Sequence, residues 1–281
     1  MALGTDQATI TTAANFIPEK WGPAVIAATE AKLVLRKLTW DWAEGGEQKG
    51  DTVHAPAVSN FTASAKAANT EVVLSVNTED VTNLSINRHD QCSFLIEDIV
   101  KAQESFNISS RFTKKAGFAV ARLMDTRIVN LIPSLTQQVG NSGTDLGDTE
   151  IRAAIEFLDI GDVDDDDRHL VMYPTQKNAI WGIEKYFRAD IRGDGASPVV
   201  NGKFGQIYGI NTYVTTNLTT SGTPAARLNV MFQRECFASV IQQSPRTQAQ
   251  YILEHLGTLV VVDSIYGEAL ARNGFGVWMK S

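Results

Sequence analysis

An acidic run at residues 162–167 is the first group in this 281-residue sequence whose residue types suggest chemistry. It reads Asp-Val-Asp-Asp-Asp-Asp and is followed by Arg168. Carboxylates are the ligands that a hard cation such as Ca²⁺ prefers. The run lacks the glycine and the distal glutamate of an EF-hand loop, and nothing spaces its side chains around an ion. We interpret it as a solvated loop between a helix and a strand, with cation binding left open as the alternative.

The histidines and cysteines are isolated from one another along the chain, whereas zinc sites place such residues at short, regular spacings. We therefore expect no metal site. Both cysteines have apolar neighbours, which favours two small core residues over a disulfide scaffold. The residues concerned are His54, His89, His169, His255, Cys92 and Cys236.

Motifs of the common enzyme classes are missing from the sequence. It contains no P-loop, no dinucleotide-binding glycine pattern, no zinc-protease helix motif and no Gly-x-Ser-x-Gly elbow. Gly202, Gly205 and Gly209 have the wrong spacing to cradle a phosphate, so we interpret them as turn and packing residues. We expect a protein that is not an enzyme and that uses no cofactor.

The composition is that of an ordinary globular chain, with 43% apolar and 20% charged residues. This excludes a disordered, a collagen-like or a coiled-coil protein. No apolar run reaches the roughly 18 residues of a spanning helix, and the N-terminus has no signal-peptide pattern. We expect a protein made in a cytoplasm-like compartment, without a membrane partner.

The negative charge is concentrated in one central block. Residues 145–194 hold 13 acidic and 6 basic residues, which accounts for the whole net charge of −7. This asymmetry favours a separate unit with its own exposed surface. No basic block occurs, which argues against a dedicated reader of nucleic acid sequence.

The first half of the chain predicts an arm, a long hairpin and a long helix. Residues 15–42 form short apolar clusters broken by Pro18, Gly22 and Pro23, typical of an arm with one or two helical turns. A strand at 51–58 precedes a second one that starts at Glu71 and continues, after a charged turn at 79–80, to residue 86. The tip at 59–69 is small and polar, and two strands alone are marginally stable. The hairpin therefore needs a partner, which is either the rest of this chain or another copy.

Residues 90–103 predict a short helix, and residues 106–132 predict a second, longer one that ends at Pro133. Apolar residues at i, i+3 and i+4 spacing give the long helix one buried face. Basic residues share another face of the helix, for which we favour solvation over anion binding. The apolar face comprises Phe112, Ala116, Ala119, Val120, Leu123, Ile128 and Leu131, and the basic face Arg111, Lys114, Lys115 and Arg122.

The second half alternates helices and strands, which indicates an α+β or α/β unit. Asp148 is the expected N-cap of a helix with Ile151, Ala154, Ile155 and Leu158 on one face. A buried strand at 170–173 precedes a helix over 175–187, with Pro174 at its first position. Strands follow at 207–210, 213–214, 251–253 and 259–262. Asn273-Gly274 predicts a hairpin turn between 269–271 and 275–279.

Taken in order, these segments resemble the major capsid protein of tailed bacteriophages over nearly the whole chain. No single piece is a strict signature, but their order and spacing make coincidence a poor explanation. The pieces that carry the resemblance are IPEKW at 17–21, KGDTV at 49–53, IED at 96–98, ARLMD at 121–125, GQIYGI at 205–210 and TNL at 216–218.

The resemblance implies an α+β, Hong Kong 97-like fold in five parts. They are an N-terminal arm at 1–44, an extended β-hairpin loop at 45–88, a peripheral domain with a long spine helix at 89–139, an axial domain at 140–233, and further peripheral strands at 234–281. It also implies contacts between subunits, for which the candidates are Ile17 and Trp21 in the arm and Phe61 and Lys66 in the loop. Some relatives join a loop lysine covalently to a neighbouring asparagine. Lys66 is the one candidate for such a bond here, and we expect it to stay unlinked.

The function implied is a major capsid protein that forms pentamers and hexamers. These build an icosahedral virion shell around double-stranded DNA, contacted non-specifically, with assembly in the host cytoplasm. A portal is an expected partner. A separate scaffolding protein is expected as well, because the arm begins almost at Met1 and lacks the long helical segment of relatives with a fused scaffold. Two alternatives remain: an encapsulin-like compartment shell around a protein cargo, and a soluble enzyme that uses the acidic block.

Overall fold

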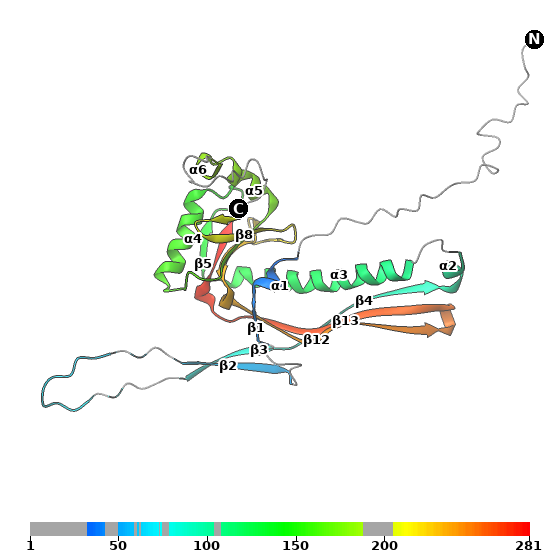
Figure 1. The fold of residues 1–281 in the computed structure, drawn as a ribbon, viewed down its shortest axis with the longest axis horizontal. Coiled ribbons are helices and arrows are strands. Elements are labelled where there is room, and N and C mark those ends of the chain that lie inside the picture. Colours follow the sequence, from blue (N-terminus) through cyan, green and yellow to red (C-terminus); the bar gives the residue numbers. More distant parts are fainter. Residues whose placement is uncertain are drawn as a thin grey trace, which may run out of the picture. The chain divides into compact units, whose positions relative to one another are not determined.

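The computed structural model describes residues 33–42, 50–58, 61, 63–72, 74, 79–103, 108–187 and 205–281. Within these ranges the chain forms two larger sheets, and one long helix, α3 (Ile108–Val129), contacts both (Figure 1). The remaining strands form a two-stranded hairpin and a second small strand pair. The small pair comprises β9 (Thr220–Ser221) and β10 (Ala226–Arg227).

The first sheet has six strands in the order β5-β14-β11-β6-β8-β7. Its central strands are buried on both faces, because neighbouring residues point to opposite sides of a strand. Leu170 and Met172 therefore face one core cluster, while Val171 between them faces the other. The strands are β5 (Gln137–Gly140), β6 (Arg168–Met172), β7 (Gln206–Ile207), β8 (Ile210–Val214), β11 (Asn229–Gln233) and β14 (Gly276–Lys280).

Helix α4 (Asp148–Ile160) covers one face of this sheet. Of the face predicted for it, Ile151, Ala154 and Leu158 are fully buried and Ile155 is partly buried. Asp148 is the first helical residue and not the N-cap. Gly147 holds the cap position, and its backbone N–H donates to Glu150 Oε2 at 2.9 Å. Two helices follow, α5 (Pro174–Trp181), which starts at the predicted proline, and α6 (Glu184–Phe187).

The second sheet has four strands in the order β1-β12-β13-β4. They are β1 (Trp40–Asp41), β12 (Phe237–Ile252), β13 (Gly257–Leu270) and β4 (Arg88–Glu97). β1 pairs with only two residues of β12. Beyond them, β12 carries two register shifts between Ile241 and Arg246, and Pro245 lies within the second. Bulges and proline protect an exposed strand edge from further pairing.

The short helix predicted over 90–103 is wrong in its first part. Residues 88–97 are strand β4, and only α2 (Asp98–Gln103) is helical. Cys92, Phe94 and Ile96 alternate with exposed residues and pack toward the sheet's covered face or core. This alternation with period 2 is the strand signal. The adjacent apolar residues at 94–96 concealed it, because a short apolar cluster fits a helix equally well.

α3 lies along the four-stranded sheet, and its buried stripe is formed by Ala116, Val120, Met124 and Ile128 at i+4 spacing. The first three pack on the four-stranded sheet, whereas Ile128 joins the core under the six-stranded one. The predicted face is therefore wrong at Leu123, which is 37% exposed. Phe112 and Ala119 are exposed as well. Met124 takes the place assigned to Leu123, one residue around the helix.

The hairpin consists of β2 (Thr52–Val58) and β3 (Glu79–Ser85), which pair antiparallel from Thr52↔Ser85 to Val58↔Glu79. The hairpin itself agrees with the sequence. The second strand, however, begins at Glu79, and the residues at 79–80 predicted as a turn are its first two. Residues 71, 72 and 74 are not in a strand, and Val76 lies outside the described residues.

The hairpin predicted at Asn273-Gly274 is wrong. These residues form a turn of 3-10 helix at 273–275, and β13 does not pair with β14. β14 instead pairs with β11 and β5 in the other sheet. The local Asn-Gly signal is overridden because the chain crosses here from one sheet to the other. Further 3-10 turns lie at Ile132–Ser134, Arg234–Cys236 and Leu253–His255.

Candidate assembly surfaces

The loop between β2 and β3 exposes large apolar side chains to solvent. Phe61 is 67% exposed, Val72 68% and Leu74 85%. Thr70 Oγ1 donates to the carbonyl of Ala67 at 2.8 Å, and Asn69 between them has a left-handed backbone, which closes the tip as a turn. The described loop residues bury none of their apolar side chains against the chain itself. This loop, residues 59–78, is here termed the extended loop.

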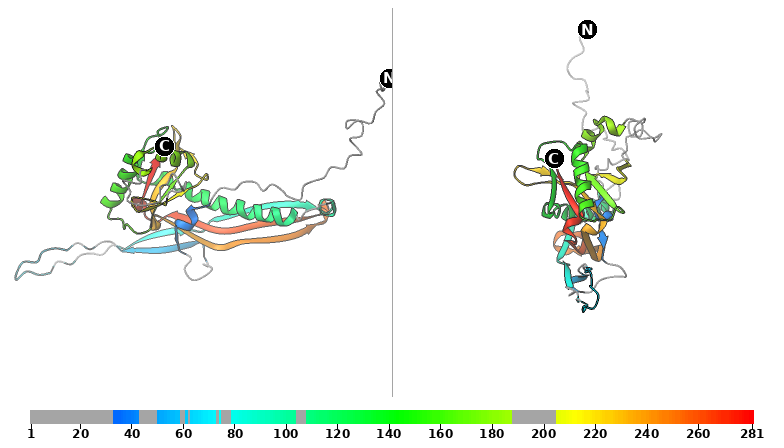
Figure 2. Two further views of the ribbon diagram at one scale, coloured as in Figure 1. Left: turned by 45° about the horizontal axis from the view of Figure 1, so that its top comes forward. Right: turned by 90° about the vertical axis from the view of Figure 1, so that its left-hand side faces the viewer.

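The base of the hairpin, in contrast, is fixed to the four-stranded sheet. Leu84 is fully buried and packs with Ala238 and Val240 of β12. Gly267 of β13 makes this approach possible, because a Cβ there would lie 2.5 Å from the carbonyl oxygen of Ser85. The hairpin and α3 pack on opposite sides of the sheet (Figure 2). The base of the hairpin therefore packs on the sheet, and the loop beyond it is exposed.

A second group of exposed apolar residues lies where α2 meets the turn between β12 and β13. The Asp98 backbone N–H donates to the Leu256 carbonyl at 2.9 Å, and Tyr251 Oη donates to Asp98 Oδ2 at 2.6 Å. These bonds hold α2 against the turn. Contiguous exposed apolar surface marks interaction sites in proteins. The group, here termed the end patch, comprises Ile99, Val100, Tyr251, Leu253 and Leu256, which are 60%, 42%, 45%, 77% and 64% exposed.

Leu256 in the end patch also has a strained backbone. Its φ is +42°, in the left-handed region, where the Cβ of an ordinary residue is crowded. A left-handed residue with a bulky side chain costs about 1 kcal/mol or more, which glycine would largely avoid. A large, exposed apolar side chain at a strained position contributes little to the subunit's own core. Both features favour a contact outside the subunit.

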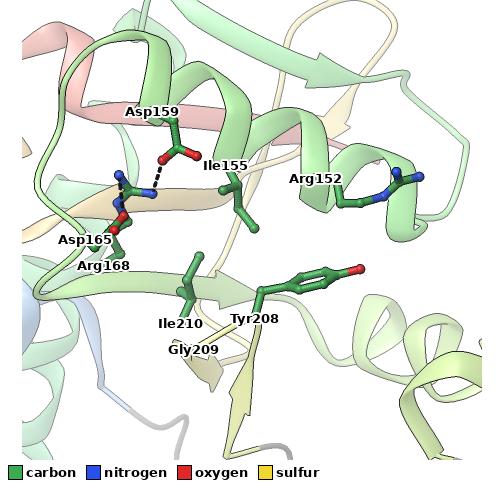
Figure 3. Close-up of a pocket in the computed structure, with 8 residues that line it drawn as sticks. All are labelled: Arg152, Ile155, Asp159, Asp165, Arg168, Tyr208, Gly209 and Ile210. Atoms are coloured by element: carbon green, nitrogen blue, oxygen red, sulfur yellow. Dashed lines mark hydrogen bonds and ion pairs between the residues drawn. The ribbon is translucent and has the colours of Figure 1, made fainter. Parts of the chain in front are cut away.

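The acidic run lies beside an open pocket of about 400 Å³ (Figure 3). Arg168, which follows the acidic run and lines the pocket, is buried. Its guanidinium donates to Asp159 Oδ1 at 2.7 Å and forms an ion pair with Asp165 at 2.9 Å. It also donates to the carbonyl oxygens of Val163 and Asp164. The guanidinium thus occupies the centre of the loop. The acidic run is therefore a loop between helix α4 and strand β6, as predicted, and its aspartates at 164–167 are exposed.

The histidines at 54, 89 and 169 and the two cysteines make hydrogen bonds or packing contacts in the structure. His54 bonds Asn83 across the hairpin, and His89 pairs with the buried Asp263. His169 packs edge-on against Tyr213 and Phe232, and burial lowers its pKa. Cys236 is fully buried, which raises its thiol pKa, and Cys92 is half-buried. The described residues contain no group of three that could hold a metal, and none of their helices is long and apolar enough to cross a membrane.

The four contact candidates named from the sequence fall into two groups. Phe61 and Lys66 lie exposed on the extended loop, whereas Ile17 and Trp21 lie outside the described residues. Sequence reasoning missed the end patch altogether. A signal existed in Leu253-Glu254-His255-Leu256, where two leucines stand in a turn between strands, a place normally occupied by polar residues.

The described residues thus form two sheets that both contact one long helix, and a hairpin that carries an exposed loop. No protein-family model and no curated protein matches the sequence. Solved structures do match. The chain is similar to a structure from Mycobacterium phage Che8, at 23% identity and a TM-score of 0.82, over 94% of this chain and 97% of the other.

It is also similar to the capsid structure of the cyanophage P-SCSP1u, at 16% identity and a TM-score of 0.79, over 99% and 96% of the two chains. A third similar structure is that of the mature capsid of bacteriophage PhiM1, at 12% identity and a TM-score of 0.73, over 94% of this chain and 91% of the other. The resemblance to tailed-phage major capsid proteins and the α+β, Hong Kong 97-like fold class are thus confirmed. At these identities the likeness establishes the fold.

Proposed function

We propose that this chain is the major capsid protein of a tailed phage. In this proposal it assembles through pentamers and hexamers into an icosahedral shell around double-stranded DNA, aided by a separate scaffolding protein and a portal. The observation that carries the proposal is the extended loop, whose apolar residues Phe61, Val72 and Leu74 are exposed in a single subunit. Such surface is stable in water when a partner covers it.

The end patch supports the same proposal. Closed shells need two or more different contacts per subunit, because each copy meets several neighbours. The extended loop and the end patch are two separate exposed apolar groups, one at residues 59–78 and one around α2 and residues 251–256. The five-part division of the chain and the contact roles of Phe61, Lys66, Ile17 and Trp21 belong to this proposal.

An encapsulin-like compartment shell would use similar surfaces. The compared capsid structures come from phages and from a GTA particle, which favours the phage capsid. Inside assembled particles, double-stranded DNA supports the proposal and a protein cargo supports the compartment shell. A subunit of 30.7 kDa that stays monodisperse at high concentration, with and without a scaffold candidate, contradicts both.

The sharpest test of the loop follows from the register Val58↔Glu79, the last pair of the hairpin. Replacing residues 59–78 with Asn-Gly joins this pair by a two-residue turn and leaves the base intact. We expect a folded, soluble subunit that forms no closed shells in negative-stain microscopy. A control keeps the loop length and changes Phe61, Val72 and Leu74 to Ser. Normal shells from the shortened chain would contradict the proposal. If the serine control forms shells and the shortened chain does not, the contact is made by the loop backbone and not by the three apolar side chains.

A further inference from the structure

Helix α3 is basic in a chain that is acidic overall. It contains five basic residues and a single acidic one, Asp125, which is fully buried, while the whole chain has a net charge of −7. The solvent-facing side of α3 is therefore positive only. The basic residues are Arg111, Lys114, Lys115, Arg122 and Arg127.

Four of these residues form one face. At about 100° per residue, Arg111, Lys115 and Arg122 fall within about 40° of one another, with Lys114 beside them. They lie opposite the stripe that packs on the four-stranded sheet. Arg111, Lys114 and Arg122 are exposed, and Lys115 is half-buried. This basic face extends about 17 Å from Arg111 to Arg122, at 1.5 Å per residue.

The basic face and the hairpin point to opposite sides of the sheet, because α3 packs on one sheet face and Leu84 of the hairpin on the other. Copies of the subunit arranged side by side through the extended loop would form a layer with α3 on one side. That side would carry a repeated basic stripe, although the subunits are acidic.

We propose that the basic face of α3 binds the phosphate backbone of the duplex DNA inside the shell, and this rests on the proposed function. Phosphates along one DNA strand rise by about 3.4 Å each, so a 17 Å face spans about five of them. Lys and Arg supply the charge that non-specific binding requires. The acidic remainder of the subunit repels DNA, which restricts the contact to this helix.

An acidic polypeptide is the competing occupant of a basic helix face. Protein partners are held mainly by buried aromatic and apolar anchors at the centre of an interface. Among the large apolar residues of α3, Phe118 lies about 20° around the helix from Arg111 and is half-buried. Phe112 and Leu123 lie farther away, about 100° from Arg111 and Arg122. Phe112 packs edge-on against Phe94, with ring centroids 5.6 Å apart. The basic face thus offers four charges and one half-buried aromatic ring, and this excess of charge over apolar surface suits a phosphate backbone better than a protein partner.

The test measures binding of the purified full-length chain to a fluorescein-labelled 30-base-pair duplex of mixed sequence over a range of NaCl concentrations. The variant changes Arg111, Lys114 and Lys115 to Gln and keeps Arg122, because Arg122 bonds to Asn217. A control removes the same charge from exposed residues outside α3, namely Arg152, Arg234 and Arg272. Each phosphate contact contributes about 0.9 to the slope of log K against log[NaCl]. We expect the variant to lower the magnitude of this slope by about 2 to 3, and the control by less than 1.

Equal effects of the variant and the control would overturn the inference, as would a wild-type chain that does not bind the duplex. Poly-L-glutamate that binds the wild-type chain more tightly than the duplex, at an equal concentration of negative charge, would overturn it in favour of an acidic protein partner. Negative-stain microscopy of the same preparations separates the two proposals. Shells that form while the slope is unchanged refute only the role of α3. A wild-type chain that forms no shells, with and without a scaffold candidate, refutes the proposed function.

Discussion

Asn217 and Asp125 form a buried pair in which Asn217 Nδ2 donates to Asp125 Oδ2 at 3.0 Å. Asp125 belongs to α3, and Asn217 lies in the segment after β8. The amide oxygen of Asn217 accepts from Arg122 Nε and Thr126 Oγ1, both at 3.2 Å. The other carboxylate oxygen of Asp125 accepts from the backbone N–H of Arg36, in the short helix α1 (Leu35–Leu38). Three distant segments therefore meet at this pair.

Asn217→Asp places a second carboxylate beside Asp125, whose pKa burial already raises. We expect a loss of about 3 kcal/mol of unfolding free energy at pH 7, since a buried charge is left without compensation. A carboxyl whose folded pKa lies above its unfolded value destabilises at high pH and recovers as the pH falls. Urea unfolding at pH 7 and pH 4.5 should therefore show partial recovery. Asn217→Ala loses the hydrogen bond that lowers the pKa of Asp125 but adds no second carboxyl, so it should recover less than Asn217→Asp. Equal pH dependence of both variants would contradict the pairing.

Gly267→Ala should loosen the hairpin base. The added Cβ meets backbone atoms of Ser85 and Ile86, and such overpacking costs about 1–3 kcal/mol. Hydrogen exchange should become faster in β2 and β3, while β6 and β11 of the six-stranded sheet stay protected. Gly117→Ala is the matched control, because its Cβ would have nothing within 4 Å. Unchanged exchange in Gly267→Ala would show that the hairpin is held in another way.

Leu256→Gly separates the stability of the subunit from its assembly. Glycine relieves the left-handed backbone at φ +42°, so the urea midpoint should stay level or rise. Shell formation should fall, because a 64% exposed leucine of the end patch is lost. Leu256→Ala removes the same contact but keeps most of the strain, so it should assemble poorly without the gain in stability. Normal shell yields from both variants would exclude Leu256 from the interface.

Met124→Asp should destabilise the subunit strongly, by about 3 kcal/mol or more, because it buries a charge between α3 and the four-stranded sheet. Leu123→Asp should cost little, because Leu123 is 37% exposed. Denaturant titration of both variants distinguishes the two faces. The opposite ranking would restore the helix face predicted from the sequence.

These two neighbours also show where sequence patterns lose resolution. Leu123 and Met124 stand at i+3 and i+4 from Val120, and both spacings fit a buried helix face. The choice depends on how α3 lies on the sheet, which local periodicity does not contain. The strand at residues 170–172, in contrast, was predictable because a short run of buried apolar residues fits a central strand whatever its partners.

The candidate surfaces were predictable only in part. The polar extended loop with Phe61 and Lys66 was evident, because few of its residues have anything to bury. The end patch was not, because its members come from residues 99–100 and 251–256 and meet only through the fold. Likewise, β14 pairs with β11 in the six-stranded sheet, and a Cβ on Gly276 would lie 2.7 Å from Cys236 Sγ. These are tertiary constraints, which the adjacent Asn-Gly turn signal does not contain.

The irregular outer edge of β12, with two register shifts and Pro245, has a consequence wherever many copies of this chain accumulate. A long regular edge would invite amyloid-like stacking of strand upon strand. The bulged edge blocks that route. Contacts between copies are then left to side chains, and strand pairing does not lengthen them into a fibre.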